Sequence, residues 1–158
     1  MREKDRIHIL FLCTGNICRS PMAEYIFKDL VEKAGMESGY VIDSAGCSDE
    51  EEGNALYPPA QKVLSEHGIP FGRHRARQVT EEDLRRADHV IVMDSWNLRS
   101  LVYRYGQKYA DKTRRMLSFC GEDDTDVSDP WYTRDFETAY REILRGCEAL
   151  LRYTGRQI

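Results

Sequence analysis

The sequence contains no apolar stretch that approaches the roughly 20 residues needed to cross a membrane. It also shows no recognisable secretion leader, because the charged start MREKDR is followed by only six apolar or near-apolar residues. We interpret residues 1–6 as a tail that leads into a strand. We therefore expect a cytoplasmic protein without membrane attachment.

The chain has no excess of positive charge. It carries 23 Lys and Arg residues against 27 Asp and Glu residues, with a formal net charge of -4 and a pI near 5.6. Proteins that bind nucleic acid through bulk charge are basic, so this balance argues against a nucleic-acid partner.

A structural zinc site typically has two closely spaced cysteine pairs of the C-x2-4-C type, and the sequence lacks such a set because Cys13 and Cys18 form its one such pair. The total number of cysteines is odd and they are scattered: Cys13, Cys18, Cys47, Cys120 and Cys147. An odd, scattered set without a leader predicts reduced thiols rather than a disulfide framework. We expect neither a metal nor another cofactor.

The 158 residues, 41% of them hydrophobic, match the size of one globular domain, and we see no linker, repeat or low-complexity tract. We predict a single domain over residues 1–158. Apolar runs predict strands over 7–12, 39–43, 88–93 and 114–119. Helices are predicted over 20–35, 57–67, 80–87, 95–105 and 133–153, with Ser20 capping the first, and Thr80 with Asp83 forming a capping box. This alternation predicts an α/β fold, a parallel sheet with helices on both faces.

The first predicted strand runs into CTGNICRSP and then into a helix. A glycine-containing loop between a strand and a helix presents backbone N–H groups and a helix N-terminus to an anion. The loop lacks the lysine and second glycine of a Walker A motif, and it lacks GxGxxG, which disfavours nucleotide binding. Instead Cys13 is followed six residues later by Arg19, whose fork can hold two phosphate oxygens. Thiols beside such donors ionise readily, so we predict covalent phosphoryl transfer on Cys13, with Ser20 donating to the thiolate.

CTGNICRSPMAE resembles the signature of the low-molecular-weight protein tyrosine phosphatases. DSAG, GN, HRARQ, MD and DPWY then follow in the family's order and spacing over most of the chain. The resemblance implies a four-stranded parallel sheet in three layers and a phosphatase acting on phosphotyrosine and aryl phosphates through a phosphocysteine. It implies that the phosphate is bound by residues 14–19, that is Thr14, Gly15, Asn16, Ile17, Cys18 and Arg19.

The family resemblance also suggests roles outside the loop. Asp129 of the DP pair would be the general acid and base, while Asp123, Asp124 and Asp126 are read as solvated loop charges. Asn16, Ser44 and His74 would hydrogen-bond to one another and hold the phosphate loop, with Arg77 and Asp94 in supporting positions. The substrate pocket would be lined by Ile17, Glu50, Trp131 and Tyr132. Tyr132, and secondarily Tyr140, are candidates for regulatory phosphorylation.

One loop departs from the family pattern, because SDEEEGN places Glu50 where the family often has an aromatic residue. Residues 49–52 then form an acidic rim that would favour substrates with basic flanks. Cys18, close to Cys13 in the same loop, could capture an oxidised nucleophile as a disulfide, or it could simply pack.

Alternatives within the same fold are a protein-arginine phosphatase and, less favoured, an arsenate reductase. Positions 80–95 contain none of the extra cysteines of an arsenate reductase. Ile17 stands where arginine phosphatases typically have threonine, and Trp131 with Tyr132 suggests a wider apolar slot. A catalytically dead phosphate-binding module would lack Cys13, Arg19 or Asp129, and all three are present. The expected partners are phosphotyrosine proteins and a cognate tyrosine kinase, and the expected state is a monomer or weak dimer.

Overall fold

The structure, a computed structural model, describes residue 2 and residues 5–156. Residues 1, 3 and 4 of the predicted N-terminal tail lie outside this part of the chain. Four parallel strands form one sheet in the order β2-β1-β3-β4. Their bounds are Ile7–Cys13 (β1), Tyr40–Gly46 (β2), His89–Val92 (β3) and Thr113–Arg115 (β4).

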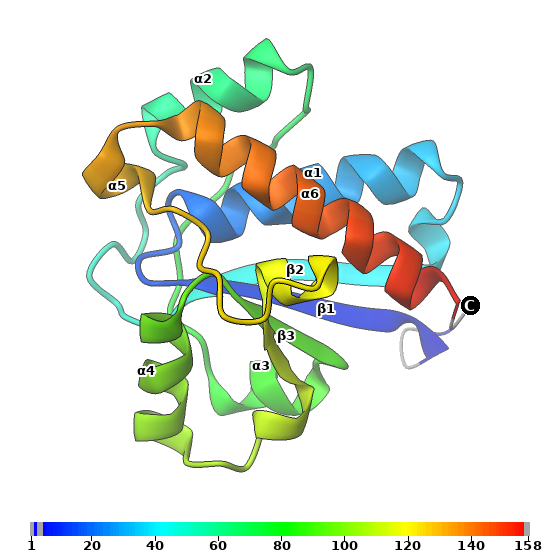
Figure 1. Cartoon of the computed structure of the whole chain (residues 1–158), viewed down its shortest axis with the longest axis vertical. Helices are drawn as coiled ribbons and strands as arrows, with labels where there is room; N and C mark the ends of the chain where they lie inside the picture. The colour runs from blue at the N-terminus through cyan, green and yellow to red at the C-terminus, as the bar shows by residue number, and fades with distance from the viewer. Residues whose placement is uncertain (1, 3–4, 157–158) are drawn as a thin grey trace.

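Helices cover both faces of this sheet, so the predicted three-layer α/β fold is confirmed (Figure 1). Helices α1, α2 and α6 lie on one side, and α3 and α4 on the other. The α-helices are Arg19–Lys33 (α1), Pro58–Glu66 (α2), Glu81–Arg86 (α3), Ser95–Tyr105 (α4), Pro130–Thr133 (α5) and Phe136–Gly155 (α6). Short 3-10 helices span Glu37–Gly39 (η2), Ala110–Lys112 (η3) and Met116–Cys120 (η4).

β1 separates two apolar cores because its side chains alternate between the faces of the sheet. Ile9, Phe11 and Cys13 pack into the core beneath α1 and α6, whereas Leu10 and Leu12 pack into the opposite core with β3 and α3. A strand that is buried on both faces reads as a continuous apolar run, which explains why IHILFL predicted it.

The predicted strand over 114–119 is mostly wrong. β4 has three residues, and the chain then winds into η4, where Met116 and Leu117 are buried in the same core as α6. Two apolar residues in succession can be buried in a short helical turn as well as in a strand, and periodicity does not distinguish them over so short a run.

Two helix boundaries also differ from the prediction. The helix predicted over 133–153 corresponds to α6, which begins at Phe136 after an Asp135 cap and ends at Gly155, while Thr133 belongs to the separate short helix α5. Helix α1 begins at Arg19, one residue before the predicted Ser20 cap. In contrast, the capping box formed by Thr80 and Asp83 is confirmed at the start of α3.

Candidate active site

The predicted phosphate loop connects β1 to α1 at the carboxyl end of the sheet, where parallel α/β folds bind ligands. Cys13 is the last residue of β1 and Arg19 the first of α1, so the Cys-x5-Arg spacing is the length of this connection. Both side chains are buried.

Ser20 lies inside the first turn of α1 and does not cap it, because Cys18 is the N-cap and makes no capping side-chain bond. The Ser20 hydroxyl instead lies 3.0 Å from Cys13 Sγ. It accepts a hydrogen bond from Asn16 Nδ2, so its own proton is available to Cys13 or to the Ala45 carbonyl oxygen at 3.3 Å. The prediction of Ser20 as a cap is therefore wrong, and the hydroxyl lies beside the thiol.

Asn16 is the central residue of the loop's internal network. It is fully buried with φ of 61°, a left-handed conformation that asparagine tolerates better than most residues. Its Nδ2 donates to Ser20 Oγ and Ser44 Oγ, and its Oδ1 accepts from the Arg77 backbone N–H at 3.1 Å. The backbone turn of the loop is thus held by side-chain bonds rather than by sheet or helix.

Two further residues complete this network. Ser44 Oγ donates to Glu24 Oε1 at 2.6 Å, linking β2 to α1. His74 Nε2 lies 2.6 Å from the Asn16 carbonyl oxygen, which can only accept, so Nε2 is the donor of this hydrogen bond. The structure therefore brings together Asn16, Ser44 and His74, as expected from the family resemblance.

The end of β2 packs directly against the phosphate loop. Cys47 N–H donates to the Cys13 carbonyl at 2.8 Å, and Ser48 N–H to the Thr14 carbonyl at 3.1 Å. A Cβ at Gly46 would lie 2.9 Å from the Thr14 carbonyl oxygen, closer than real Cβ contacts. Gly46, of the DSAG segment, is required for this approach of two backbones.

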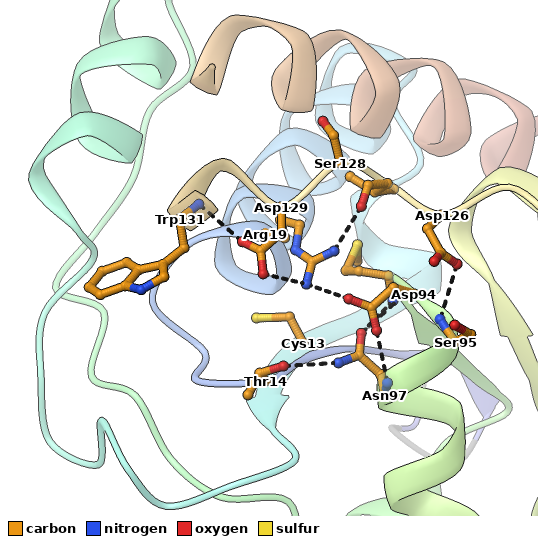
Figure 2. A network of polar contacts seen from close by, with 12 residues as sticks. Cys13, Thr14, Arg19, Asp94, Ser95, Asn97, Asp126, Ser128, Asp129 and Trp131 are labelled. Atoms are coloured by element: carbon orange, nitrogen blue, oxygen red, sulfur yellow. Dashed lines mark hydrogen bonds and ion pairs between the residues drawn. The ribbon is translucent and has the colours of Figure 1, made fainter. Parts of the chain in front are cut away.

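Arg19 is 2% exposed, and its guanidinium is fixed by two strong bonds (Figure 2). Nη1 donates to the Val127 carbonyl at 2.8 Å and Nη2 to Asp94 Oδ2 at 2.7 Å. A guanidinium has five N–H donors, so these bonds leave others for a ligand. Burial alone would lower the pKa of Arg19, but Cys13, Asp129 and Asp94 outweigh it and leave the pKa raised, so the cation persists.

Asp129 lies next to Arg19 although the two are 110 residues apart in sequence. Its Oδ1 caps α5 by accepting from Trp131 N–H at 3.0 Å, and its Oδ2 lies 3.4 Å from Arg19 Nη2 (Figure 2). The carboxyl group is about one-third exposed and lines the same pocket as Cys13.

The loop that carries Asp129 is tied to the rest of the molecule on both sides. Val127 N–H donates to the Met93 carbonyl at the end of β3, and Ser128 donates from its backbone and its hydroxyl to Glu142 Oε1 on α6. Asp126 is exposed, as expected for a solvated loop charge, but it is not free of contacts. It accepts from Ser95 N–H, which joins the loop to the start of α4 (Figure 2), and it also accepts from Arg115 Nη1.

These groups border a pocket of about 590 Å³. Its lining includes the four predicted pocket residues Ile17, Glu50, Trp131 and Tyr132. The complete lining is Cys13, Thr14, Gly15, Ile17, Cys18, Arg19, Glu50, Glu51, Asp94, Trp96, Ser100, Asp129, Trp131 and Tyr132. Sequence reasoning missed Trp96 and Ser100, which reach the pocket from α4, and no local signal marks them.

Burial raises the pKa of the Cys18 thiol strongly, with further contributions from Cys13 and Asp129, so Cys18 is protonated at neutral pH. Burial likewise raises the pKa of Cys47 to about 12. Neither of these two thiols therefore rests as a thiolate.

The two tyrosines considered for phosphorylation differ in accessibility. Tyr132 is 82% exposed at the pocket edge, whereas Tyr140 is 5% exposed and stacks on His67 with ring centroids 3.9 Å apart. Burial removes Tyr140 as an accessible acceptor and leaves Tyr132.

Within the described residues, no cluster of three or more His, Cys, Asp or Glu side chains could hold a metal ion. Over the same part of the chain, no helix combines the length and apolarity that crossing a bilayer requires.

The low molecular weight phosphotyrosine protein phosphatase family model matches residues 8–158. The chain belongs to this family. It is 44% identical over 146 residues to the low molecular weight protein-tyrosine-phosphatase YfkJ of Bacillus subtilis, covering 92% of this chain and 94% of that relative. It is 38% identical over 155 residues to the human low molecular weight phosphotyrosine protein phosphatase, covering 96% and 98%. The resemblance inferred from the motifs is confirmed.

Solved structures of the family agree with the fold. The crystal structure of Bacillus subtilis YfkJ aligns with a TM-score of 0.92 at 42% identity, over 96% of both chains. A Drosophila arginine phosphatase aligns with a TM-score of 0.83 at 32% identity, over 92% of this chain and 96% of that one. The chain is thus a phosphatase of this family, whose relatives include proteins named for two different phosphoamino acids.

Proposed function

We propose that this phosphatase hydrolyses phosphotyrosine in proteins through a phosphocysteine on Cys13, with Arg19 binding the phosphate and Asp129 as general acid and base. The observation that carries this proposal is that one pocket holds all three groups, which come from the end of β1, the start of α1 and the loop before α5. We propose that residues 1–158 act as one domain for this reaction.

In the first step, the Cys13 thiolate attacks the phosphorus and the bond from phosphorus to the phenol oxygen breaks. The electron pair leaves with the oxygen, and Asp129 supplies the proton that converts it to a phenol. Ser20 lies within hydrogen-bonding distance of the thiolate, and Arg19 with the loop N–H groups stabilises charge on the phosphoryl oxygens.

In the second step, the Asp129 carboxylate accepts a proton from water while the water oxygen attacks the phosphocysteine. The bond between sulfur and phosphorus breaks, the thiolate is regenerated and inorganic phosphate leaves. The Ser20 hydroxyl, 3.0 Å from Sγ, donates to the departing thiolate. Asp94 and the Val127 carbonyl keep the Arg19 fork oriented through both steps.

A second candidate is a protein-arginine phosphatase. Glu50 and Glu51 line the pocket, and their carboxylates could pair with the guanidinium of a phosphoarginine. The similar Drosophila protein is named an arginine phosphatase. Ile17 and the aromatic pair Trp131 and Tyr132 favour a flat phenol ring instead, and for this reason we place phosphotyrosine first.

Hydrolysis of phosphotyrosine and phosphoarginine peptides by the wild type, Cys13→Ser and Asp129→Ala tests the proposal. We expect phosphotyrosine to be preferred, Cys13→Ser to be inactive, and Asp129→Ala to be slowed roughly 10²- to 10⁴-fold, as for a lost general acid. Asp124→Ala is the control, because that exposed carboxylate is not among the pocket residues. An active Cys13→Ser enzyme would contradict the mechanism, and a preference for phosphoarginine would contradict the substrate.

We further propose a cytoplasmic protein that acts as a monomer or weak dimer opposite a cognate tyrosine kinase. The family membership supports phosphoprotein substrates, and the exposed Tyr132 offers such a kinase an acceptor at the pocket edge.

A further inference from the structure

Trp96 is a large aromatic side chain at the pocket that remains mostly exposed. It is 68% exposed, although a large apolar ring in water is unfavourable, and it lines the pocket from the first turn of α4. Large exposed aromatic residues at the edge of a cavity are typical of binding sites, and tryptophan is the residue most enriched among those that dominate binding energy.

Trp96 is held in place by its neighbours. The Arg99 guanidinium lies 4.4 Å from the centroid of the Trp96 ring, a cation–π contact. Arg99 also donates to the Ser95 carbonyl at 3.4 Å and to Ser95 Oγ at 3.3 Å. A ring that is already ordered loses little conformational entropy when a ligand binds, so this arrangement is prepared for a contact.

The position of Trp96 separates it from the phosphate-binding floor. Cys13 and Arg19 at the floor are buried, while Trp96 is mostly exposed and therefore belongs to the rim. The pocket volume of about 590 Å³ lies within the range of roughly 300–1,000 Å³ that is typical of sites for drug-sized ligands. A single aromatic side chain does not fill a pocket of this size. The rim is thus available to residues next to the phosphotyrosine.

Building on the proposed function, we propose that Trp96 is a specificity-determining residue that binds a large apolar side chain directly flanking the phosphotyrosine of the substrate. An apolar side chain fits because covering the exposed indole removes apolar surface of both groups from water. Arg99 already occupies the cation–π position on this ring, and Glu50 and Glu51 on the pocket wall repel acidic flanks.

The test uses phosphotyrosine peptides that carry leucine, glycine or aspartate on both sides of the phosphotyrosine. We compare kcat/KM for the wild type, Trp96→Ala, Trp96→Phe and Tyr103→Ala. Tyr103 is the matched control, because it is an exposed aromatic (94%) two turns farther along α4 and is not among the pocket residues. Circular dichroism verifies that each variant is folded.

We expect the wild type to prefer the leucine peptide over the glycine peptide by roughly five- to tenfold, mainly through KM. Trp96→Ala should lose this preference, Trp96→Phe should keep most of it, and Tyr103→Ala should keep all of it. A ratio that is unchanged in Trp96→Ala, or a wild-type preference for aspartate, would overturn the role of Trp96 while leaving the proposed function intact. A wild type that hydrolyses none of the three peptides would instead overturn the proposed function.

Discussion

Asn16 shows how one side chain can shape the loop between β1 and α1. It is buried, adopts a left-handed backbone conformation and contacts Ser20, Ser44 and the backbone of Arg77. Alanine can make none of these side-chain bonds and is strained at a φ of 61°. The consequences should therefore extend to both stability and rate.

We expect Asn16→Ala to lower the free energy of unfolding by about 2–4 kcal/mol, because it leaves buried polar partners unsatisfied and strains the backbone. The rate constant kcat should also fall, since Ser20 loses the donor that orients its hydroxyl toward Cys13. Urea unfolding and steady-state kinetics measure the two effects. Asn54→Ala is the control, because its amide makes a single exposed bond to Glu51, and the prediction fails if both variants behave alike.

Cys18 allows a prediction about oxidation. Peroxide converts the Cys13 thiolate to a sulfenic acid, which the Cys18 thiol can capture as a disulfide with release of water. We expect the wild type to recover activity with a reducing thiol after brief exposure to peroxide, and Cys18→Ser to recover several-fold less.

Cys120→Ser controls for the general loss of a thiol, because Cys120 bonds to the Arg145 carbonyl and does not line the pocket. Equal recovery of Cys18→Ser and the wild type would show that Cys18 only packs.

Among the secondary-structure elements, α6 packs unusually closely against η4 at Gly146. A Cβ at this position would lie 2.7 Å from Met116 Cγ and 3.1 Å from the Met116 carbonyl oxygen in η4. The side chain of Met116 can shift, but the carbonyl oxygen cannot do so without moving η4. The turn that replaces the predicted end of β4 therefore depends on a glycine in the facing helix.

We expect Gly146→Ala to destabilise the protein by about 1–2 kcal/mol. Overpacking costs roughly 1–3 kcal/mol, and the better helix propensity of alanine offsets at most about 1 kcal/mol. Gly155→Ala in the same helix is the matched control, since its Cβ would meet only Met36 Cε at 3.4 Å. Thermal unfolding should separate the two, and a stabilised Gly146→Ala would show that Met116 moves aside at no cost.

The protein as a whole carries a formal net charge of -4, and two of its carboxylates, Glu50 and Glu51, line the pocket. Carboxylates at the mouth of a cleft attract cationic and repel anionic ligands, and salt weakens both effects. The acidic loop should therefore select among phosphopeptides by their flanking charge.

We expect phosphopeptides with basic flanks to have several-fold higher kcat/KM than those with acidic flanks, with a smaller difference at high salt. Glu50→Gln combined with Glu51→Gln should reduce the preference. Glu52→Gln should not, because this exposed neighbour is not among the pocket residues. Equal rates on both peptides at low salt would contradict the prediction.

Much of the fold and the centre of the site could be predicted from short stretches of sequence. The apolar run before CTGNICRSP predicted β1, and the motif predicted that a thiol and an arginine border one anion-binding loop. Such predictions succeed because strand alternation, helix capping and loop geometry are local properties of a few consecutive residues. They failed for 116–119, where a short apolar run fits a strand and a helical turn equally well.

The amino-acid sequence was sufficient to predict the order of the four strands and the Cys-x5-Arg loop. The family resemblance pointed to Asp129, which the structure places in the same pocket as Cys13 and Arg19. The three-dimensional path of the chain was needed to place Asp94 and the Val127 carbonyl on Arg19 and to bring Trp96 to the rim of the pocket. In the sequence, Arg19 is 75 positions from Asp94 and 108 positions from Val127. No local periodicity encodes these contacts, because they depend on how the helices and loops pack around the carboxyl end of one parallel sheet.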